Sequence, residues 1–189
     1  KLFKLAPKYN QKYLNLLKMV KPNKRTFLIC AQLRIGGKTQ SNVRDDTVYT
    51  RGNESMKFWQ FINEKYVSER KRRNKKFIYR IFITSDLDYI RDEADRVFGK
   101  EHVVYNPETP SHIDKDFKHL DENCDGVDST IVDFHLLQHC DASVMSHSSF
   151  GVFGSWLRPQ PTKEFYVFTK NNQNELRRNY GERTNLTFV

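Results

Sequence analysis

The sequence has no apolar segment long enough to cross a membrane and no pattern typical of a signal peptide. It begins at Lys1, inside a polar segment with helical character. We therefore expect a soluble fragment of a longer protein, with any membrane anchor outside this chain. A length of 189 residues suits one ordinary domain with a full core and is short for two.

Several motifs of known catalytic sites are also missing. There is no Walker loop, no Gly-x-Ser-x-Gly elbow and no His-Glu-x-x-His, and Gly36-Gly37 does not complete a Gly-x-Gly-x-x-Gly fingerprint. The six histidines and three cysteines show no metal-ligand spacing. We therefore predict no metal and no cofactor.

The few cysteines permit at most one disulfide. Cys124–Cys140 is one possible pair among Cys30, Cys124 and Cys140, and the sequence leaves the pairing open. Two sequons, at Asn53 and Asn185, would be glycosylated in a secretory lumen.

Positive charge is abundant, with a formal net charge of +9. Three interpretations stay open: a polyanion partner, an anionic small molecule such as a nucleotide diphosphate, and a solvated face. Six of the basic residues lie in Glu69–Lys76, which we expect to be a solvated loop. No aromatic residue interrupts that run, which weakens a single-strand nucleic-acid interpretation.

Apolar periodicity predicts strands that alternate with helices. The expected helices are 9–20, 54–68, 88–98, 128–139 and 148–157, the expected strands are 26–35, 76–84, 102–105, 141–146 and 165–169, and 39–53 is expected to be a loop. This alternation indicates an α/β fold, a Rossmann-like parallel sheet with helices on both faces. We expect an amino-terminal helix and linker over 1–25, the domain over 26–170, and a polar, partly helical tail over 171–189.

Two runs follow strands at the carboxyl edge of the predicted sheet, where ligands bind in such folds. Arg34 precedes two glycines, and its guanidinium can hold a diphosphate or form a surface salt bridge. Ser148-Ser149-Phe150-Gly151 opens a helix, so it can bind an anion or simply cap the helix.

Two acidic positions have competing interpretations. Asp133 can accept hydrogen bonds from guanine, or can be a favourable charge near a helix start. Asp86-Leu87-Asp88 resembles a metal-binding carboxylate pair, but it starts a helix after a strand, so we favour capping, with Ser85 as a further cap.

At these residues the chain resembles the fucosyltransferase superfamily that uses GDP-fucose, most closely the alpha-1,2-fucosyltransferases. Asp133-Phe-x-Leu-Leu-x-x-Cys140, followed by Val144-Met145-Ser146 and Ser149-Phe150-Gly151, matches their last donor-binding motif. Ile81–Asp86 resembles the middle motif, and Gln32–Gly36 the first. The family usually has His where Gln32 stands and an acidic residue where Gly37 stands.

The resemblance implies the carboxyl-terminal, donor-binding lobe of a two-lobed glycosyltransferase of the GT-B type. It implies inverting, metal-independent transfer of L-fucose from GDP-fucose to a glycan or glycoprotein hydroxyl, in the Golgi or ER lumen. Arg34 would be catalytic by stabilising the GDP leaving group. The implied donor-binding residues are Gln32, Arg34, Gly36, Ser85, Asp86, Asp133, Ser148, Ser149 and Phe150.

Two alternatives remain beside this hypothesis. One is a non-catalytic relative that binds a nucleotide sugar or a carbohydrate. The other is a basic polyanion-binding module that uses Arg70–Lys76. We expect no nucleic-acid partner.

Overall fold

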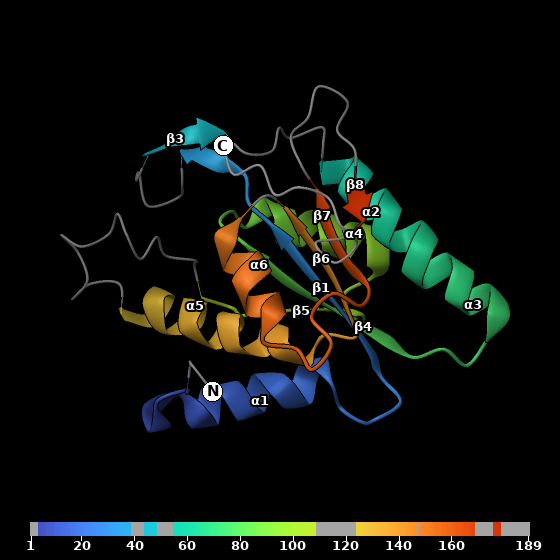
Figure 1. The fold of residues 1–189 in the computed structure, drawn as a ribbon, viewed down its shortest axis with the longest axis horizontal. Helices are drawn as coiled ribbons and strands as arrows, with labels where there is room; N and C mark the ends of the chain where they lie inside the picture. Colours follow the sequence, from blue (N-terminus) through green and yellow to red (C-terminus); the bar gives the residue numbers. More distant parts are fainter. Residues whose placement is uncertain are drawn as a thin grey trace.

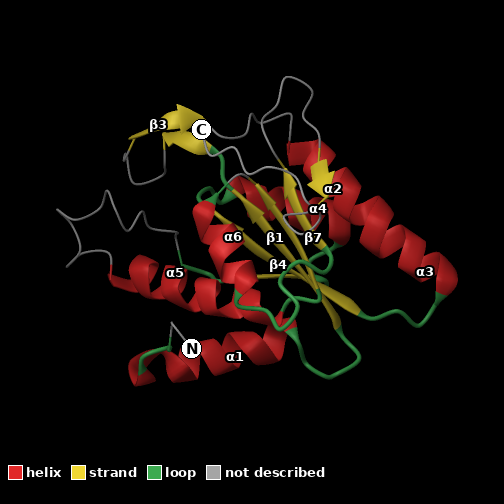
Figure 2. Ribbon diagram, in the orientation of Figure 1, coloured by secondary structure: helices red, strands yellow, loops and turns green. Residues whose placement is uncertain are grey.

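A computed structural model of the chain describes residues 4–38, 44–48, 55–108, 124–146, 148–168 and 176–178. In this part of the chain, six strands form one sheet in the order β5-β4-β1-β6-β7-β8 (Figures 1 and 2). They are β1 (Phe27–Leu33), β4 (Tyr79–Ser85), β5 (Val103–Tyr105), β6 (Ala142–Ser146), β7 (Phe165–Phe168) and β8 (Leu176–Arg178). The first five are parallel, and β8 pairs antiparallel with β7.

Helices cover both faces of this sheet. They are α1 (Asn10–Val20), α2 (Ser55–Ile62), α3 (Glu69–Arg73), α4 (Tyr89–Phe98), α5 (Cys124–Leu136) and α6 (Ser149–Trp156). Shorter helical turns are η1 (Pro7–Tyr9), the π-helical η2 (Asn63–Ser68) and η4 (Leu137–His139). α2, η2 and α3 follow one another without a break.

The core consists of two clusters, one on each face. Ile29, Ala31 and Leu33 of β1 face α2 and α4, and pack with residues such as Trp59 and Phe98. Leu28 and Cys30 face the opposite side, where Leu16 of α1, Leu136 of α5 and Phe150 of α6 pack. Burial on both faces explains why β1 is apolar except at Gln32. The predicted Rossmann-like α/β fold is confirmed.

The strand order fixes where a ligand would bind. From β1 the chain first builds outward through β4 to β5, and then returns to add β6 and β7 on the other side. The order therefore reverses between β1 and β6. In open α/β sheets this switch point leaves a crevice at the carboxyl ends of the strands.

The loop predicted over 39–53 was wrong in part. Residues 44–48, predicted as loop, form β3 (Arg44–Val48), which pairs antiparallel with β2 (Gly36–Lys38) in a separate small sheet. The sequence of β3 lacks the apolar alternation that marks strands, so it gave no signal. Of the tail predicted as partly helical, residues 176–178 form β8, which pairs with the distant strand β7, and the rest lies outside the described residues.

The basic run was also misassigned in part. Glu69–Arg73 is α3, where we expected a solvated loop. Lys, Arg and Glu favour helices, and Glu69 accepts from Arg73 one turn later at 2.5 Å. The helix therefore extends η2 and ends at Arg73.

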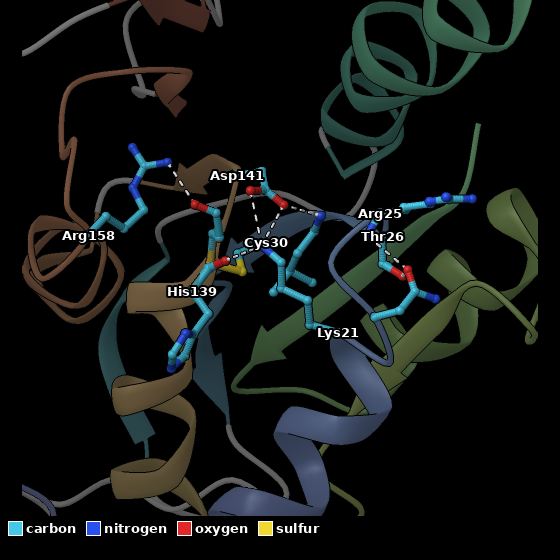
Figure 3. Close-up of polar contacts among 10 residues, drawn as sticks. Lys21, Arg25, Thr26, Cys30, His139, Asp141 and Arg158 are labelled. Carbon is cyan, nitrogen blue, oxygen red and sulfur yellow. Dashed lines mark hydrogen bonds and ion pairs between the residues drawn. A yellow bond between two sulfur atoms is a disulfide. The ribbon is translucent and has the colours of Figure 1, made fainter. Parts of the chain in front are cut away.

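α1 is packed into the domain. Leu16 and Val20 are buried in the cluster shared with α5. Lys21, just beyond α1, donates to both carboxylate oxygens of Asp141 at 3.0 and 2.9 Å, and Asp141 also accepts the amide of Leu28 at 2.8 Å (Figure 3). These bonds tie the end of α1 to the starts of β1 and β6. The domain boundaries at residues 26 and 170 stay predictions.

A disulfide joins Cys30 in the middle of β1 to Cys140, with 5.7 Å between their Cα atoms (Figure 3). The pair named as one possibility from the sequence, Cys124–Cys140, is not the one formed. Cys124 opens α5, whereas Cys140 lies just before β6, the neighbour of β1. Non-local strand pairing thus decides which cysteine lies within reach.

We predict that removing this disulfide with Cys30→Ser and Cys140→Ser destabilises the fold by about 3–5 kcal/mol. The crosslink spans 110 residues, and closure of so long a loop restricts the unfolded chain strongly. Urea unfolding with and without reductant measures the loss. Cys124→Ser is the matched control and should unfold like the wild type; a loss in Cys124→Ser equal to that of the double variant would contradict the pairing.

Candidate functional site

The turn after β1 is held by one carboxylate. Asp86 follows β4 and accepts the amides of Ile35 (2.9 Å) and Gly36 (2.8 Å), one on each carboxylate oxygen. The same carboxylate lies 3.4 Å from Nε of Arg34. Gly36 has φ +75°, a conformation that other residues rarely adopt. The turn is therefore ordered, and Arg34 projects from a fixed backbone.

Ser85 supports the same turn. Its hydroxyl donates to the carbonyl of Leu33 at 2.8 Å and accepts the amide of Leu87 at 3.3 Å. Asp88 occupies the N-cap position of α4 without a side-chain cap bond, and pairs with Arg91 at 3.1 Å. The capping interpretation of Asp86 and Asp88 was wrong, because β1 and β4 pair in parallel and bring non-local amides to Asp86.

Gln32 and Ser146 connect β1 to β6 at the switch point. The amide of Arg34 donates to the Ser146 hydroxyl at 2.7 Å, and that hydroxyl donates to Oε1 of Gln32 at 3.3 Å. A Cβ on Gly151 would lie 2.7 Å from the same Oε1, so a larger residue there would require the Gln32 side chain to move. Gln32 is buried, and its side chain supports the turn indirectly, through the Ser146 hydroxyl.

The start of α6 lies beside this network. Ser148 is the N-cap residue and makes no side-chain cap bond, while its carbonyl accepts the amide of Val152 at 3.1 Å. Ser149 is exposed, and the ring of Phe150 packs 5.7 Å from Phe134 of α5. The expected hydroxyl cap is absent at Ser148. The amino end of α6 thus offers polar groups and a positive dipole end at the switch point.

Asp133 lies in a buried polar cluster that starts from β5. It is only 8 % exposed, and Asn106 donates to it at 3.2 Å. Burial raises the pKa of Asp133 to about 7, against the opposing effects of Asn106 and nearby Arg91. The expectation that Asp133 sits near a helix start was wrong, since α5 already begins at Cys124.

Charged groups surround that cluster. Lys12 of α1 forms an ion pair with Glu108 at 2.7 Å and donates to Ser129 at 2.9 Å. Arg91 of α4 is buried and donates to the carbonyl of Glu108 at 3.1 Å. α1, α4 and α5 therefore meet around the end of β5.

Asn106 was not among the site residues predicted from the sequence. It follows β5 directly and is 2 % exposed. The available signal was a polar residue directly after an apolar strand. The short strand Val103–Tyr105 gave no further reason to select it. Its partner Asp133 is distant in sequence and comes close only in the folded chain.

The predicted site residues thus gather along the carboxyl edge of the sheet. Arg34 and Gly36 follow β1, Ser85 ends β4, Asp86 follows it, and Ser148 follows β6. These groups can bind an anion through a guanidinium, hydroxyls and a helix terminus. The sequons at Asn53 and Asn185 lie outside the described residues.

None of the described helices is long and apolar enough to span a bilayer. Among the described residues, no group of three or more His, Cys, Asp and Glu side chains is arranged to hold a metal ion. Metal independence of the reaction stays a prediction.

We predict that Asp86→Ala destabilises the fold by roughly 2–4 kcal/mol, because two turn amides lose their acceptor and Arg34 loses its ion pair. Thermal unfolding measures the change. Asp92→Ala, an exposed position on α4, is the control. Equal melting temperatures for the two variants would refute the role of Asp86.

We predict that Asp133→Asn stabilises the protein above pH 7 and not below pH 4. A folded pKa of about 7, raised from 3.8, makes the native state lose stability as pH rises between these values. The gain at pH 8 should be on the order of 2–4 kcal/mol. Urea unfolding at pH 4, 6 and 8 tests it, with exposed Asp125→Asn on the same helix as control. A gain that is the same at all three pH values would contradict the prediction.

No family model matches this sequence, and no curated protein sequence matches it. Solved structures do resemble the fold. The alpha-1,6-fucosyltransferase NodZ co-crystallised with GDP matches with a TM-score of 0.55 and 15% identity, over 92% of this chain and 47% of NodZ. NodZ soaked with GDP-fucose matches with a TM-score of 0.56 and 14% identity, over 92% of this chain and 48% of NodZ. NodZ from Bradyrhizobium matches with a TM-score of 0.53 and 14% identity, again over 92% of this chain and 48% of NodZ.

The chain spans about half the length of these NodZ structures. At such low identity the likeness concerns the fold. In fold, this chain resembles about half of a fucosyltransferase.

Proposed function

We propose that this chain is the GDP-fucose-binding, carboxyl-terminal lobe of a two-lobed fucosyltransferase of the GT-B type. The observation that carries the proposal is the ordered turn of Arg34–Gly36 at the switch point, held by Asp86 and Ser146 beside the start of α6. The fold likeness to NodZ, which was crystallised with GDP and soaked with GDP-fucose, supports it. The motif resemblance to alpha-1,2-fucosyltransferases adds the expected linkage class.

The diphosphate is assigned to Arg34 and the start of α6. The Asp86 carboxylate and the Ser146 hydroxyl fix both the backbone and the guanidinium of Arg34, so little order is lost when an anion binds. Ser148 and Ser149 open α6, where backbone amides and the helix dipole favour phosphate oxygens.

The guanine base is assigned to Asp133. A carboxylate can accept hydrogen bonds from both N1–H and the N2 amino group of guanine. Asn106 holds one oxygen of Asp133 and so orients the carboxylate. Because the donors of guanine favour the ionised form, base binding would lower the pKa of Asp133 from about 7.

The reaction would be inverting and metal-independent. The acceptor hydroxyl oxygen attacks the fucose anomeric carbon from the face opposite the phosphate, and the carbon–oxygen bond to GDP breaks with its electron pair on the β-phosphate. Arg34 stabilises that developing charge, an electrostatic role that depends on its preset position. The proton of the acceptor hydroxyl passes to a base, and a glycan or glycoprotein in the Golgi or ER lumen is the proposed acceptor.

A non-catalytic relative is the second candidate. Gln32 stands where the related motif usually has His, and it is buried in a hydrogen bond with Ser146. A neutral amide there can hold the turn but cannot supply a charge or a proton. Such a protein would bind GDP-fucose without transferring fucose.

Calorimetric titration of GDP into the wild-type chain and into Arg34→Ala tests the donor site. We expect the wild type to prefer GDP over ADP and GMP. Arg34→Ala should weaken GDP binding roughly 10- to 100-fold, since a hydrogen bond to a charged group contributes about 1.5–3 kcal/mol. Arg96→Ala on α4, an exposed cation, is the control and should bind like the wild type.

A folded wild-type chain that binds neither GDP nor GDP-fucose at millimolar concentration would overturn the donor-site proposal. Binding of GDP by a longer chain that contains both lobes, without fucose transfer or GDP-fucose hydrolysis, would favour the non-catalytic candidate.

A further inference from the structure

The edge of the sheet opposite the donor site carries a row of exposed cations. The loops that lead into the parallel strands contribute Lys100 before β5, Lys75 and Lys76 before β4, Lys24 and Arg25 before β1, and Lys163 before β7. Because these strands are parallel, all of the loops lie at the amino-terminal edge. We call this set of six residues the basic edge.

The strand order makes the basic edge linear. β5, β4, β1, β6 and β7 lie in that sequence across the sheet. Neighbouring strands are about 4.8 Å apart, so the cations from Lys100 to Lys163 span roughly 19 Å. A row of this kind matches a chain polymer with regularly repeated negative groups.

α3 extends the same surface. It ends on the side where the chain enters β1 and β4 (Figure 1). Arg70 lies over the ring of Phe27 at 4.0 Å, and Lys71 over the ring of Tyr79 at 4.9 Å, which sets both side chains at the amino ends of these strands. Arg72 and Arg73 are exposed beyond them.

The acidic groups near this edge are mostly engaged. Asp141 binds Lys21 and the amide of Leu28, and Glu164 accepts the Tyr66 hydroxyl at 2.9 Å. Glu101 remains exposed beside His102. Asp141 and Glu164 are thus held by other groups, whereas all six cations of the basic edge are solvent-exposed.

We propose that the basic edge, together with α3, binds a sulfated polysaccharide. Guanidinium and ammonium groups in a row pair with sulfate groups along such a chain, and the release of its counterions drives binding, as it does for other linear polyanions. The site is independent of the proposed donor site, since the two lie at opposite ends of the strands.

Two other anionic partners fit less well. Single-stranded nucleic acid needs exposed rings on which bases stack, but Tyr66 and Tyr79 are buried and Phe27 is covered by Arg70. A lipid surface needs apolar anchors as well as cations. In the described loops of this edge, Ile78 is the one large apolar side chain that is exposed, at 44 %.

The test uses two variants with the same loss of charge. The edge variant is Lys24→Gln/Lys75→Gln/Lys76→Gln. The control variant is Lys4→Gln/Lys8→Gln/Lys57→Gln, three exposed lysines outside the basic edge. Binding of a heparin oligosaccharide is measured from 50 to 300 mM salt, beside desulfated heparin, single-stranded DNA and phosphatidylserine vesicles.

We expect the wild type and the control variant to bind heparin alike and desulfated heparin weakly. The edge variant should bind at least about tenfold less tightly at 150 mM salt, with a salt slope lower by up to about 3, roughly one per cation removed. Saturating GDP and Arg34→Ala should leave heparin binding unchanged, which separates this proposal from the donor site.

Three results would overturn the proposal. One is an equal loss of heparin binding in both variants, which would indicate a response to net charge alone. Another is binding to DNA or to vesicles as tight as to heparin. The third is no heparin binding by the folded wild type at 150 mM salt.

Discussion

The carboxylate of Asp86 fixes the turn after β1, and the whole carboxyl edge of the sheet is arranged around that turn. It accepts two consecutive amides and forms an ion pair with Arg34, so one side chain just after β4 sets both the backbone and the cation that follow β1. Ser146 completes the constraint from β6 through the amide of Arg34. Residues of the two neighbouring strands, or just after them, thus fix the turn that follows β1. A preorganised anion site requires a backbone fixed in this way.

The two ends of the strands carry charge in different ways. At the carboxyl edge, Arg34 and Asp133 are each held by a specific partner, so they suit a small ligand of defined shape. At the amino edge, cations such as Lys75 and Lys163 extend from loops and are exposed to solvent. An extended polymer fits that second arrangement better. The basic residues behind the net charge of +9 thus lie at both edges of the sheet, in different surroundings.

Sequence periodicity was sufficient to predict the order of strands and helices, because β1 and β4 are buried on both faces and read as apolar runs. It located Arg34 and Ser148 at the correct edge for the same reason. It could not predict the roles of Asp86, Asn106 and Cys30, whose partners lie 27 to 110 residues away. Locally, Asp86 looks like a helix cap. Only the parallel pairing of β1 with β4 makes it an acceptor for the turn.

The most direct test of the central claim is hydrogen–deuterium exchange of the chain with and without GDP. The account predicts that GDP slows exchange at 34–36 and 149–151, where the turn and the start of α6 meet. It also predicts no change in the loops before β1 and β4. Slowed exchange confined to the amino edge, or bound GDP with no effect at 34–36, would contradict the assignment of the donor site to the switch point.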